Sequence, residues 1–557
     1  MKIVISLILS FYTLLGAQYT IDFFGNKTFT KKRLYKELGF EQTLWQKILH
    51  KKFRPKVEEK LIPTLYDELK LFYQEQGFWD ANITAKIQKD TLLFIIEEHT
   101  PLHISALATT SDFSIESFIP FKKGDRFIVS QFVKMKKDIK DALLKNGYCS
   151  YEFIPKAYVY KKEKSVVISI YLAKGSLCKI KTISIHGLQS IPAKVVKDHI
   201  YVQPGDIFSL SKIDESYKRL YSLEYFNAVR FDYSKKIDNQ IFLDINCKER
   251  KKVHLYKAGV GFESDRGAIV SFQYKNLNYH AKQISLDLFY ADITKKVELG
   301  YFMPSSITLF QNRYDIKHTF SYTQDRFDIF KSKEITYKLK LLKEDYNKGI
   351  SFGLQPSHIQ IADTNESCIE RKNYTLLAPF IDIFIDKRNE KFFPTNGYFL
   401  GLFAQGSLLD GEYFKTSVKA GIYYALPKGV LFLKGTLGEI LGNKIPPTKL
   451  FIAGGVQSNR AYPFRSLYAL DSSCKIGGKS LLATTVEYHY PLDSYYLALF
   501  WDRTYIDSNT LQFNKAVDGV GIGILYPTVV GTIKVYFGFN PSHIVQNSLG
   551  LYIGASF

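Results

Sequence analysis

The histidines, cysteines and serines of this chain are the residues best suited to catalysis or metal binding, but none has the spacing that such chemistry requires. The 11 His include no H-E-x-x-H, which would place two metal ligands and a base on one helical face. The sequence also lacks the G-x-S-x-G turn of a serine nucleophile and the G-x-x-x-x-G-K-[ST] loop that cradles phosphates. We therefore expect a protein that is not an enzyme, with no catalytic residues, no metal and no cofactor.

One charged side chain is distinguished by its setting. Arg460 follows the pair Gly454-Gly455 and precedes Ala461 and Tyr462 within the stretch FIAGGVQSNRAYPF. A guanidinium that folds into an interior needs anionic partners, because an unpaired buried charge is strongly disfavoured. The alternative is that Arg460 is an ordinary, solvated loop charge.

Length and charge limit the classes of protein to which the chain can belong. Its 557 residues are too many for one hydrophobic core, because a single core usually stops growing at about 250 to 300 residues. Only 18 Pro and a charged fraction of 23% exclude collagen-like and wholly disordered chains. The balance of 75 Lys+Arg against 54 Asp+Glu, a net charge of +21, indicates an anionic partner such as nucleic acid, anionic lipid or lipopolysaccharide.

The first residues predict export. Lys2 is followed by an apolar run, 3–15, that is too short to span a bilayer, and then by the small residues Gly16 and Ala17. We expect a secretory signal peptide over 1–17; the alternative is a buried first strand or helix. No later window is apolar enough for a membrane helix, so an exported chain would be periplasmic, secreted or a β-barrel. Nucleic acid is then not expected as a partner.

The N-terminal half repeats itself. The segments FKKGDRF, from Phe121, and VQPGDIF, from Val202, lie 81 residues apart and share a Gly-Asp-x-Phe core. Amphipathic stretches precede strand-like pairs; in the first, apolar residues recur at helical spacing and a glycine, Gly77, follows them as a C-terminal stop. These apolar positions are Leu61, Leu65, Leu69 and Phe72. The predicted order is β-α-α-β-β in three copies, an α+β architecture.

This order resembles the POTRA domain, with IDFFGN and ISIHGL opening units and LYSLEYFNAV closing the third helical stretch. We place POTRA-like repeats at 18–100, 101–175 and 176–250; three unrelated α+β domains are the alternative. The open sheet edges of such units would accept an extended client as an added strand, with low sequence specificity.

The C-terminal half, 253–557, alternates with a period of two. Apolar residues occupy every second position in ISLDLFY, TIKVYFGF and the final LGLYIGASF, which ends on Phe557. A soluble β-sandwich also alternates, but dense Tyr and Phe and alternating short and long turns favour a transmembrane antiparallel β-barrel. At roughly 19 residues for each strand with its loop, the region holds about 16 strands.

The loop containing Arg460 resembles the signature of the BamA/TamA outer-membrane assembly superfamily, with Ala461 where that family usually has Gly. Further patterns of the family occur in order: FIDKRN with PTNG, then VEY, then FWD, and GVGFESDRG near the start of the barrel. The matching positions are Asp386, Arg388, Pro394, Gly397, Glu487, Asp502, Gly259, Gly261 and Arg266.

The resemblance implies roles for these residues. Gly454, Gly455, Arg460, Ala461 and Tyr462 would form a loop inside the lumen, and carboxylates downstream, Glu487 and Asp502, would accept the guanidinium. Ordinary strand and loop charges are the alternative. The first and last barrel strands would pair weakly as a lateral gate, with gate residues at Gly259, Gly261, Arg266, Leu549, Ile553 and Phe557.

The implied function is insertion or translocation of outer-membrane proteins without ATP. Three repeats resemble TamA more than BamA; a BamA role, a two-partner secretion transporter, a passive porin and an outer-membrane hydrolase remain as alternatives. Expected partners are unfolded outer-membrane proteins or autotransporters, lipopolysaccharide and phospholipid of the outer membrane, and an inner-membrane or lipoprotein assembly partner. The barrel would lie in the bacterial outer membrane with the repeats in the periplasm.

The five cysteines form no C-x-x-C pair, so neither a zinc site nor a dense disulfide framework is indicated. Two bridges are open to an exported chain: Cys178 with Cys247 in the third repeat, and Cys368 with Cys474 between external loops. Cys149 would then be the odd thiol, a small buried hydrophobe.

Overall fold

The chain divides into two compact units, each described here by itself. The first comprises Met1–Ile183, Val202–Ser211 and Tyr233–Leu243, and the second Ser184–Tyr201, Lys212–Asp232 and Asp244–Phe557. The predicted signal peptide, 1–17, lies outside the described residues except for Ala17. A computed structural model of the chain describes residues 17–40, 53–263, 266–309, 312–345, 347–391, 393–471, 474–492, 495–528, 531–541 and 543–553.

In the described part of the first repeat, two helices pack against one sheet. Its strands lie in the order β2-β1-β4-β3, with β1 and β4 parallel. The stripe predicted on the long helix is buried at Leu65, Leu69 and Phe72, whereas Leu61 lies in a 3₁₀ turn before the helix and is 45% exposed, against the prediction. The described elements are β1 (Gln18–Phe24), α2 (Lys31–Glu37), β2 (Lys56–Glu58), η1 (Glu59–Leu61), α4 (Ile62–Glu75), β3 (Asn82–Gln88) and β4 (Thr91–Glu97).

The second repeat departs from the predicted order. Its first helical position holds only a single 3₁₀ turn, with Ile115 buried and Phe118 and Ile119 packed against the same core. The elements are β5 (His103–Ser111), η2 (Glu116–Phe118), α5 (Val129–Lys145), β6 (Glu152–Tyr160) and β7 (Ser165–Ala173). The sheet order is β5-β7-β6, so β5 and β6 are its edges.

The third repeat has the predicted order with one short extra strand, and its residues contribute to both units. Strand β11 places Ile241, Leu243, Ile245 and Cys247 on one buried face, as alternation along a strand requires. The elements are β8 (Lys179–His186), α6 (Ala193–Asp198), α7 (Leu210–Ser222), β9 (Phe226–Asp232), β10 (Lys236–Ile237) and β11 (Gln240–Glu249).

A carboxylate closes the loop after the first strand in both the first and the third repeat. Glu98, just after β4, accepts hydrogen bonds from the Thr28 backbone N–H at 3.0 Å and the Thr28 hydroxyl at 2.6 Å. Glu249, at the end of β11, accepts from the backbone N–H groups of Gln189 at 2.8 Å and Ile191 at 2.9 Å. The same local solution therefore recurs where the repeats align.

The disulfides correct one cysteine prediction and confirm the other. Cys149 is bonded to Cys178, with Cα atoms 5.8 Å apart, so the predicted bridge from Cys178 to Cys247 is wrong and Cys149 is not the odd thiol. An isolated antiparallel β-bridge between the backbones of Tyr148 and Leu177 brings Cys149 beside Cys178. The thiol of Cys247 is free and buried in the core. Cys368 is bonded to Cys474 as predicted, with Cα atoms 6.4 Å apart.

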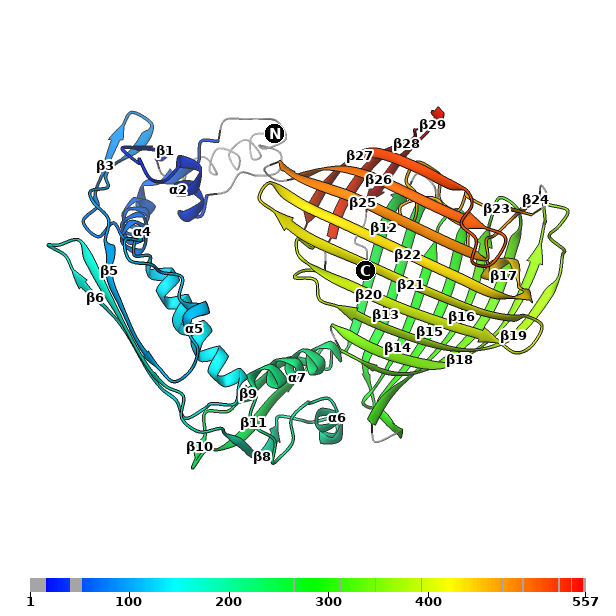
Figure 1. Cartoon of the computed structure of the whole chain (residues 1–557), viewed down its shortest axis with the longest axis horizontal. Helices are drawn as coiled ribbons and strands as arrows, with labels where there is room; N and C mark the ends of the chain where they lie inside the picture. Colours follow the sequence, from blue (N-terminus) through cyan, green and yellow to red (C-terminus); the bar gives the residue numbers. More distant parts are fainter. Residues whose placement is uncertain are drawn as a thin grey trace, which may run out of the picture. The chain divides into compact units, whose positions relative to one another are not determined.

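The C-terminal region forms a closed antiparallel barrel, drawn from green through yellow to red in Figure 1. Sixteen described strands make the wall, which confirms the predicted fold and strand number. They are β12 (His254–Glu263), β13 (Gly267–Tyr279), β14 (Lys282–Tyr290), β15 (Thr294–Leu309), β16 (Asn312–Arg326), β17 (Lys331–Glu344), β18 (Lys348–Ala362), β19 (Asn373–Asp386), β20 (Gly397–Ser407), β21 (Glu412–Leu426), β22 (Gly429–Lys444), β25 (Ser480–Leu492), β26 (Tyr495–Asp507), β27 (Ala516–Thr528), β28 (Gly531–Asn540) and β29 (His543–Ile553).

Side chains alternate across the wall of the barrel. On β17, for example, Ile335 and Tyr337 are exposed on the outer face, whereas Ser332 between outward neighbours is buried. The long segment between β22 and β25 carries η3 (Pro447–Lys449) and a hairpin of β23 (Ala469–Asp471) with β24 (Cys474–Ile476). No helix within the described ranges is both long and apolar enough to cross a membrane.

Candidate functional site

The segment between β22 and β25 folds into a tight turn that presents Arg460. Gly454 and Gly455 adopt φ values of +107° and +76°, a region that only glycine enters without strain. The Gly455 N–H donates to the Tyr462 carbonyl at 2.8 Å, and the Asn459 N–H donates to the Gly455 carbonyl at 3.0 Å. The glycine pair therefore sets the reversal that aims the next side chain at the barrel wall.

Arg460 binds Asp502 of β26 in a bidentate manner. Its Nε lies 2.8 Å from Asp502 Oδ2 and its Nη2 lies 2.8 Å from Oδ1, while the Arg460 backbone N–H donates to Oδ2 at 3.0 Å. The remaining Nη1 donates to Glu487 Oε2 of β25. The three side chains are at most 5% exposed, so the charges are paired where water cannot screen them.

Aromatic and polar side chains complete this cluster. The guanidinium lies 3.7 Å from the ring centre of Phe500 and 4.7 Å from that of Tyr536, within cation–π range. The second oxygen of Glu487 lies 2.7 Å from His489 Nε2 and accepts from the Tyr536 hydroxyl at 3.3 Å. Each carboxylate thus has partners beyond the arginine, which is what stabilises buried charge.

Glycines on the neighbouring strands β27 and β28 make room for the turn. A Cβ atom at Gly538 of β28 would lie 2.6 Å from the Arg460 carbonyl oxygen, and one at Gly519 of β27 would lie 2.8 Å from the Ala461 Cβ. Ala461 does not adopt a positive φ, so alanine fits where the family usually has glycine. Tyr462 accepts a hydrogen bond from the Asn540 amide at 2.5 Å.

The second predicted motif lies elsewhere, in the turn between β19 and β20. Arg388 donates hydrogen bonds to the Asp386 carboxylate from Nε at 2.8 Å and from Nη2 at 2.7 Å. Its guanidinium lies 5.2 Å from the Phe399 ring centre. Pro394 is buried in the turn, and Gly397 has a φ of +105°. These residues are brought together in one turn, and Phe393 of that turn packs beside His489 and Phe500 of the Arg460 cluster.

The first and last barrel strands are hydrogen-bonded to each other and close the barrel. Within the described residues, β12 pairs with β29 only at Phe262 with Ile553 and at Glu263 with Tyr552, whereas β12 pairs with β13 along its whole length. Of the predicted gate residues, Gly259 and Gly261 lie on β12, Leu549 and Ile553 lie on β29, and Phe557 lies outside the described residues.

Arg266 connects the end of the first strand to the loop. Its guanidinium lies 5.3 Å from the ring centre of Phe464, four residues after Arg460, and 5.9 Å from that of Phe289. A neighbouring arginine, Arg465, donates to Asp325 Oδ1 of β16 at 3.0 Å. The loop is therefore held at three places around the barrel.

A second buried contact, between His199 and Asp315, joins α6 of the third repeat to the barrel, and no sequence motif indicated it. His199 Nε2 lies 3.1 Å from Asp315 Oδ1, and His199 Nδ1 lies 2.7 Å from the Val195 carbonyl oxygen. That carbonyl can only accept, so Nδ1 carries a hydrogen. Ser305, at an irregularity within β15, donates its backbone N–H to Asp315 Oδ1 at 2.7 Å, and His199 is 1% exposed.

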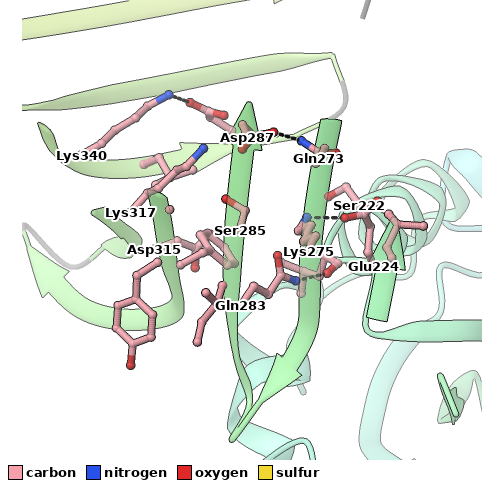
Figure 2. Close-up of a pocket in the computed structure, with 18 of the residues that line it drawn as sticks. Ser222, Glu224, Gln273, Lys275, Gln283, Ser285, Asp287, Asp315, Lys317 and Lys340 are labelled. Atoms are coloured by element: carbon pink, nitrogen blue, oxygen red, sulfur yellow. Dashed lines mark hydrogen bonds and ion pairs between the residues drawn. The ribbon is translucent and has the colours of Figure 1, made fainter. Parts of the chain in front are cut away.

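The rest of this junction spreads over the neighbouring turns of the barrel. Asp198 pairs with Arg313, Glu224 pairs with Lys275, and the Gln283 amide donates to the Leu223 carbonyl at 2.6 Å. Figure 2 shows Lys275 and Glu224 pointing toward each other across this region.

A cavity of about 560 Å³ opens inside the barrel beside these residues (Figure 2). Its wall carries both signs of charge, including Lys257 and Lys317 against Asp287 and Asp315. Across the part of the chain that the structure describes, no group of three or more His, Cys, Asp or Glu side chains is arranged to hold a metal ion.

Several residues of these clusters were not predicted from the sequence, although the alternation of inward and outward side chains along a strand indicates some of them. Thr485, Glu487 and His489 lie at every second position of β25 and therefore share its inner face. Thr485 donates to Asp502 at 2.8 Å. The missed residues around Arg460 are Thr485, His489, Phe500, Tyr536, Gly519 and Gly538.

Two family models match the chain at the places where these elements lie. Residues 178–250 match the surface antigen variable number repeat, the POTRA model, and residues 276–556 match the Omp85 superfamily domain, about half of the chain. The chain belongs to the Omp85 superfamily.

Named relatives agree with this membership. The chain is 22% identical over 434 residues to the outer membrane protein assembly factor BamA of Nitratidesulfovibrio vulgaris, covering 72% of this chain and 54% of that protein. It is 21% identical over 499 residues to BamA of Neisseria meningitidis serogroup B, covering 79% of this chain and 61% of that protein. The chain thus spans little more than half the length of these relatives.

The same fold occurs in a solved structure. BamA from Haemophilus ducreyi, in a form that lacks POTRA domains 1–3, aligns with a TM-score of 0.56 at 16% identity, over 81% of this chain and 99% of that one. The Omp85 member described here therefore lies in the outer membrane, with its POTRA region in the periplasm. Because the chain passes from β11 into β12, the His254 end of β12 is the periplasmic end of the barrel.

Proposed function

We propose that this Omp85 protein inserts or translocates outer-membrane proteins, and that the seam between β12 and β29 is the gate through which a client enters the membrane. The support is that β12 and β29 are the first and last strands of the wall and close it through the pairs Phe262–Ile553 and Glu263–Tyr552. Release of these pairs would leave β12 and β29 each with an unpaired edge. An antiparallel strand with a free edge offers its N–H and C=O groups to another strand.

Outward side chains of β12 are more exposed than their neighbours on β13. Val260 is 84% exposed and Tyr256 is 64% exposed, compared with 50% for Val270 and 37% for Phe272 on β13. A client hairpin could therefore add to β12 while the opposite edge at β29 closes behind it. The predicted gate residues Gly259, Gly261, Arg266, Leu549, Ile553 and Phe557 belong to this proposal.

The Arg460 cluster would support the gate from inside. Arg460 fixes its loop to β25 and β26, and Phe464 of the same loop contacts Arg266 just after β12. Movement of β12 during opening would have to release that contact while the buried ion pair keeps the loop in place. In this view the loop is a support with one movable connection.

The repeats at 18–100, 101–175 and 176–250 would all be POTRA domains that receive unfolded clients. The second offers an edge strand, β6, whose apolar residues Ile154, Tyr158 and Tyr160 are 40 to 49% exposed. A client segment could add there as a further strand, with the aromatic side chains contributing apolar contact.

Within the superfamily we favour a TamA-like accessory role, because the sequence divides into three repeats before the barrel. The BamA core role is the alternative, and a two-partner secretion transporter or a passive porin follows. Depletion of the protein with quantification of all outer-membrane barrels separates the first two. Loss of a few barrels or autotransporters with survival supports the accessory role, whereas a general loss with death supports the core role. Large, steady conductance in planar bilayers would favour the porin.

A cysteine pair across the seam tests the gate. In Glu263→Cys/Tyr552→Cys the new thiols occupy directly paired positions, so oxidation should lock β12 to β29 and stop client assembly, with recovery on reduction. Val260→Cys/Val270→Cys is the matched control, because it places the same bond between β12 and β13, which the proposal keeps together. Full client assembly with the seam locked would refute the gate; equal loss in the control would show only that β12 tolerates no bridge.

A further inference from the structure

The outer rim of the barrel carries a row of polar side chains in lateral register across five strands. Tyr290 of β14 is paired with Lys295 of β15, and Lys295 is paired with Gln324 of β16. The row continues from Gln324 to Lys333 of β17 and from there to Gln360 of β18. Directly paired residues of a sheet point to the same face, so these five side chains share one side of the wall.

That side is the outer, lipid-facing one. Two positions further along the same strands, the row is Leu288, Val297, Tyr322 and Ile335, and of these Leu288, Val297 and Ile335 are 39 to 44% exposed. Large exposed apolar residues in a membrane barrel mark the face that meets hydrocarbon. The polar row therefore lies directly next to the hydrophobic band.

The row lies at the end of the barrel away from the periplasm. Strand β14 ends and β15 begins at the turn 291–293, and this turn is at the opposite end from the one where β11 enters the barrel. The polar row therefore meets the outer leaflet, at the depth where lipid head groups lie.

Positive charge gathers in this row and in the next one outward. Lys331 lies two residues from Lys333 along β17, toward the loop end of the strand, and is paired with Arg326 of β16. Two lysines of β17 and one arginine of β16 therefore lie together on the same face. Lys295 lies 5.4 Å from the ring centre of Tyr290, which holds its ammonium group over the row. A hollow of about 450 Å³ is lined by Lys295, Gln324, Arg326, Lys331 and Lys333.

The acidic residues that line the same hollow are Asp292, Asp325 and Asp363. Asp325 points inward, where it accepts from the Thr294 hydroxyl at 2.6 Å and from Arg465 at 3.0 Å. Asp363 pairs with Lys331 at 2.9 Å. Asp292 is exposed at the turn above. Among the described ion pairs, none involves Lys295 or Lys333, so these two ammonium groups remain available to an anionic ligand.

We propose that Lys295 and Lys333, with the Gln324 amide between them, bind the phosphate of a phosphorylated lipid head group in the outer leaflet. Neighbouring strands lie about 4.8 Å apart, so side chains two strands apart can converge on one phosphate. The acyl chains would then lie along the apolar row that begins with Val297 and Ile335. A lipid likewise places its phosphate at the membrane surface and its hydrocarbon chains toward the membrane centre.

Lipid binding by the purified full-length protein in detergent tests this site. The probes are lipid A carrying its phosphates, the same lipid with the phosphates removed, and inorganic phosphate. Lys295→Gln/Lys333→Gln should weaken binding of phosphorylated lipid A by roughly 10- to 30-fold, the expected effect of removing two cations near an anionic lipid surface. The phosphate-free lipid should bind wild type and variant equally weakly.

Lys296→Gln/Lys338→Gln is the matched control. It removes the same charge from β15 and β17 but on the inner face, where Lys296 pairs with Glu298 and Lys338 lies over Phe380. This control should bind phosphorylated lipid A like wild type. Unchanged binding in Lys295→Gln/Lys333→Gln, or an equal loss in the control, would overturn the site. Binding of inorganic phosphate with the same dependence on Lys295 and Lys333 would overturn its assignment to a lipid.

Discussion

Arg460 and His199 each fix a separate segment to the same barrel by a buried ion pair, and the two pairs differ in chemistry. Arg460 holds a loop inside the lumen with two carboxylates, Glu487 and Asp502. His199 holds α6 of the third repeat to Asp315 alone. Arg460 presents three side-chain nitrogens to two carboxylates, whereas His199 presents one ring nitrogen to one carboxylate.

The difference indicates two kinds of attachment. The loop is fixed by several hydrogen-bond donors of one buried guanidinium, so it is suited to remain in place while strands around it move. The third repeat is fixed through one histidine, supported by Asp198 with Arg313 and Glu224 with Lys275 around it. We expect this junction to yield before the loop does.

The largest effect is expected for Arg460→Ala. Removal of one partner of a buried ion pair leaves Glu487 and Asp502 uncompensated and should cost about 3 to 5 kcal/mol of stability. Thermal unfolding of the barrel, followed by its heat-dependent gel mobility, measures this cost. Arg460→Lys keeps the charge but loses the bidentate grip, so it should recover only part of the loss.

Arg465→Ala is the matched control in the same loop. Its guanidinium and its partner Asp325 are 29% and 19% exposed, so its removal should cost about 1 kcal/mol or less. A comparable loss in both variants would mean that the loop depends on its total charge and not on the buried pair.

The next effect concerns the junction. His199→Ala leaves Asp315 buried without its partner and should destabilise the attachment of α6 by about 2 to 3 kcal/mol. Hydrogen exchange in the full chain should quicken in Ala193–Asp198 while β25 and β26 stay protected. Faster exchange throughout the barrel would contradict the view that this pair acts locally.

A smaller, pH-dependent effect is expected at Glu249. Burial alone would raise the pKa of this carboxyl, but the Ser190 hydroxyl and the backbone N–H groups of Gln189, Ile191 and Ser190 lower it by more, so the net pKa is lowered. A depressed folded-state pKa gives stability that is present above the unfolded value, about 4.3, and is lost as the pH falls through the folded value. Glu249→Gln should cost about 1 to 2 kcal/mol at neutral pH and little in acid.

Exchange of the Gln189–Ile191 amides at two pH values measures this effect. The gap between wild type and Glu249→Gln should narrow as the pH is lowered below about 4. A gap that stays constant with pH would show that the carboxylate charge is not what closes the loop.

The smallest effect is expected at Cys247. Burial raises the pKa of its thiol to about 11, with the nearby Glu249 charge adding to the shift, so almost none is thiolate at neutral pH. Iodoacetamide should leave the folded protein unlabelled and label Cys247 once the third repeat opens. Rapid labelling of the native chain would mean that β11 is not packed as described.

The sequence predicted the fold where the hydrophobic periodicity was strong and where glycines marked the ends of elements. Alternation over 253–557 gave the barrel and its strand number, and Gly77 marked the end of α4. It failed at Leu61, because a 3₁₀ turn precedes α4, and at η2, where a single turn replaces a helix. Local pattern cannot show which of two turn types a short segment adopts.

The site was predictable in part for a similar reason. Arg460, Glu487 and Asp502 were identified through a motif, and the geometry brings them together. His199 and Asp315 are 116 residues apart and carry no motif, so only the fold reveals the pair. The cysteine pairing likewise depends on a contact that carries no sequence motif. Cys178 is bonded to Cys149 because a backbone β-bridge between Tyr148 and Leu177 places the two cysteines side by side.

The central claim, that clients enter at the edge of β12, is tested most directly by photo-crosslinking from that edge. A photoreactive residue at Val260 would be compared with one at Leu299 of β15, which also faces outward and is 50% exposed. During assembly of an outer-membrane protein, we predict crosslinks to the client from position 260 and not from position 299. Equal crosslinking from both positions, or none from position 260 while assembly proceeds, would contradict the account.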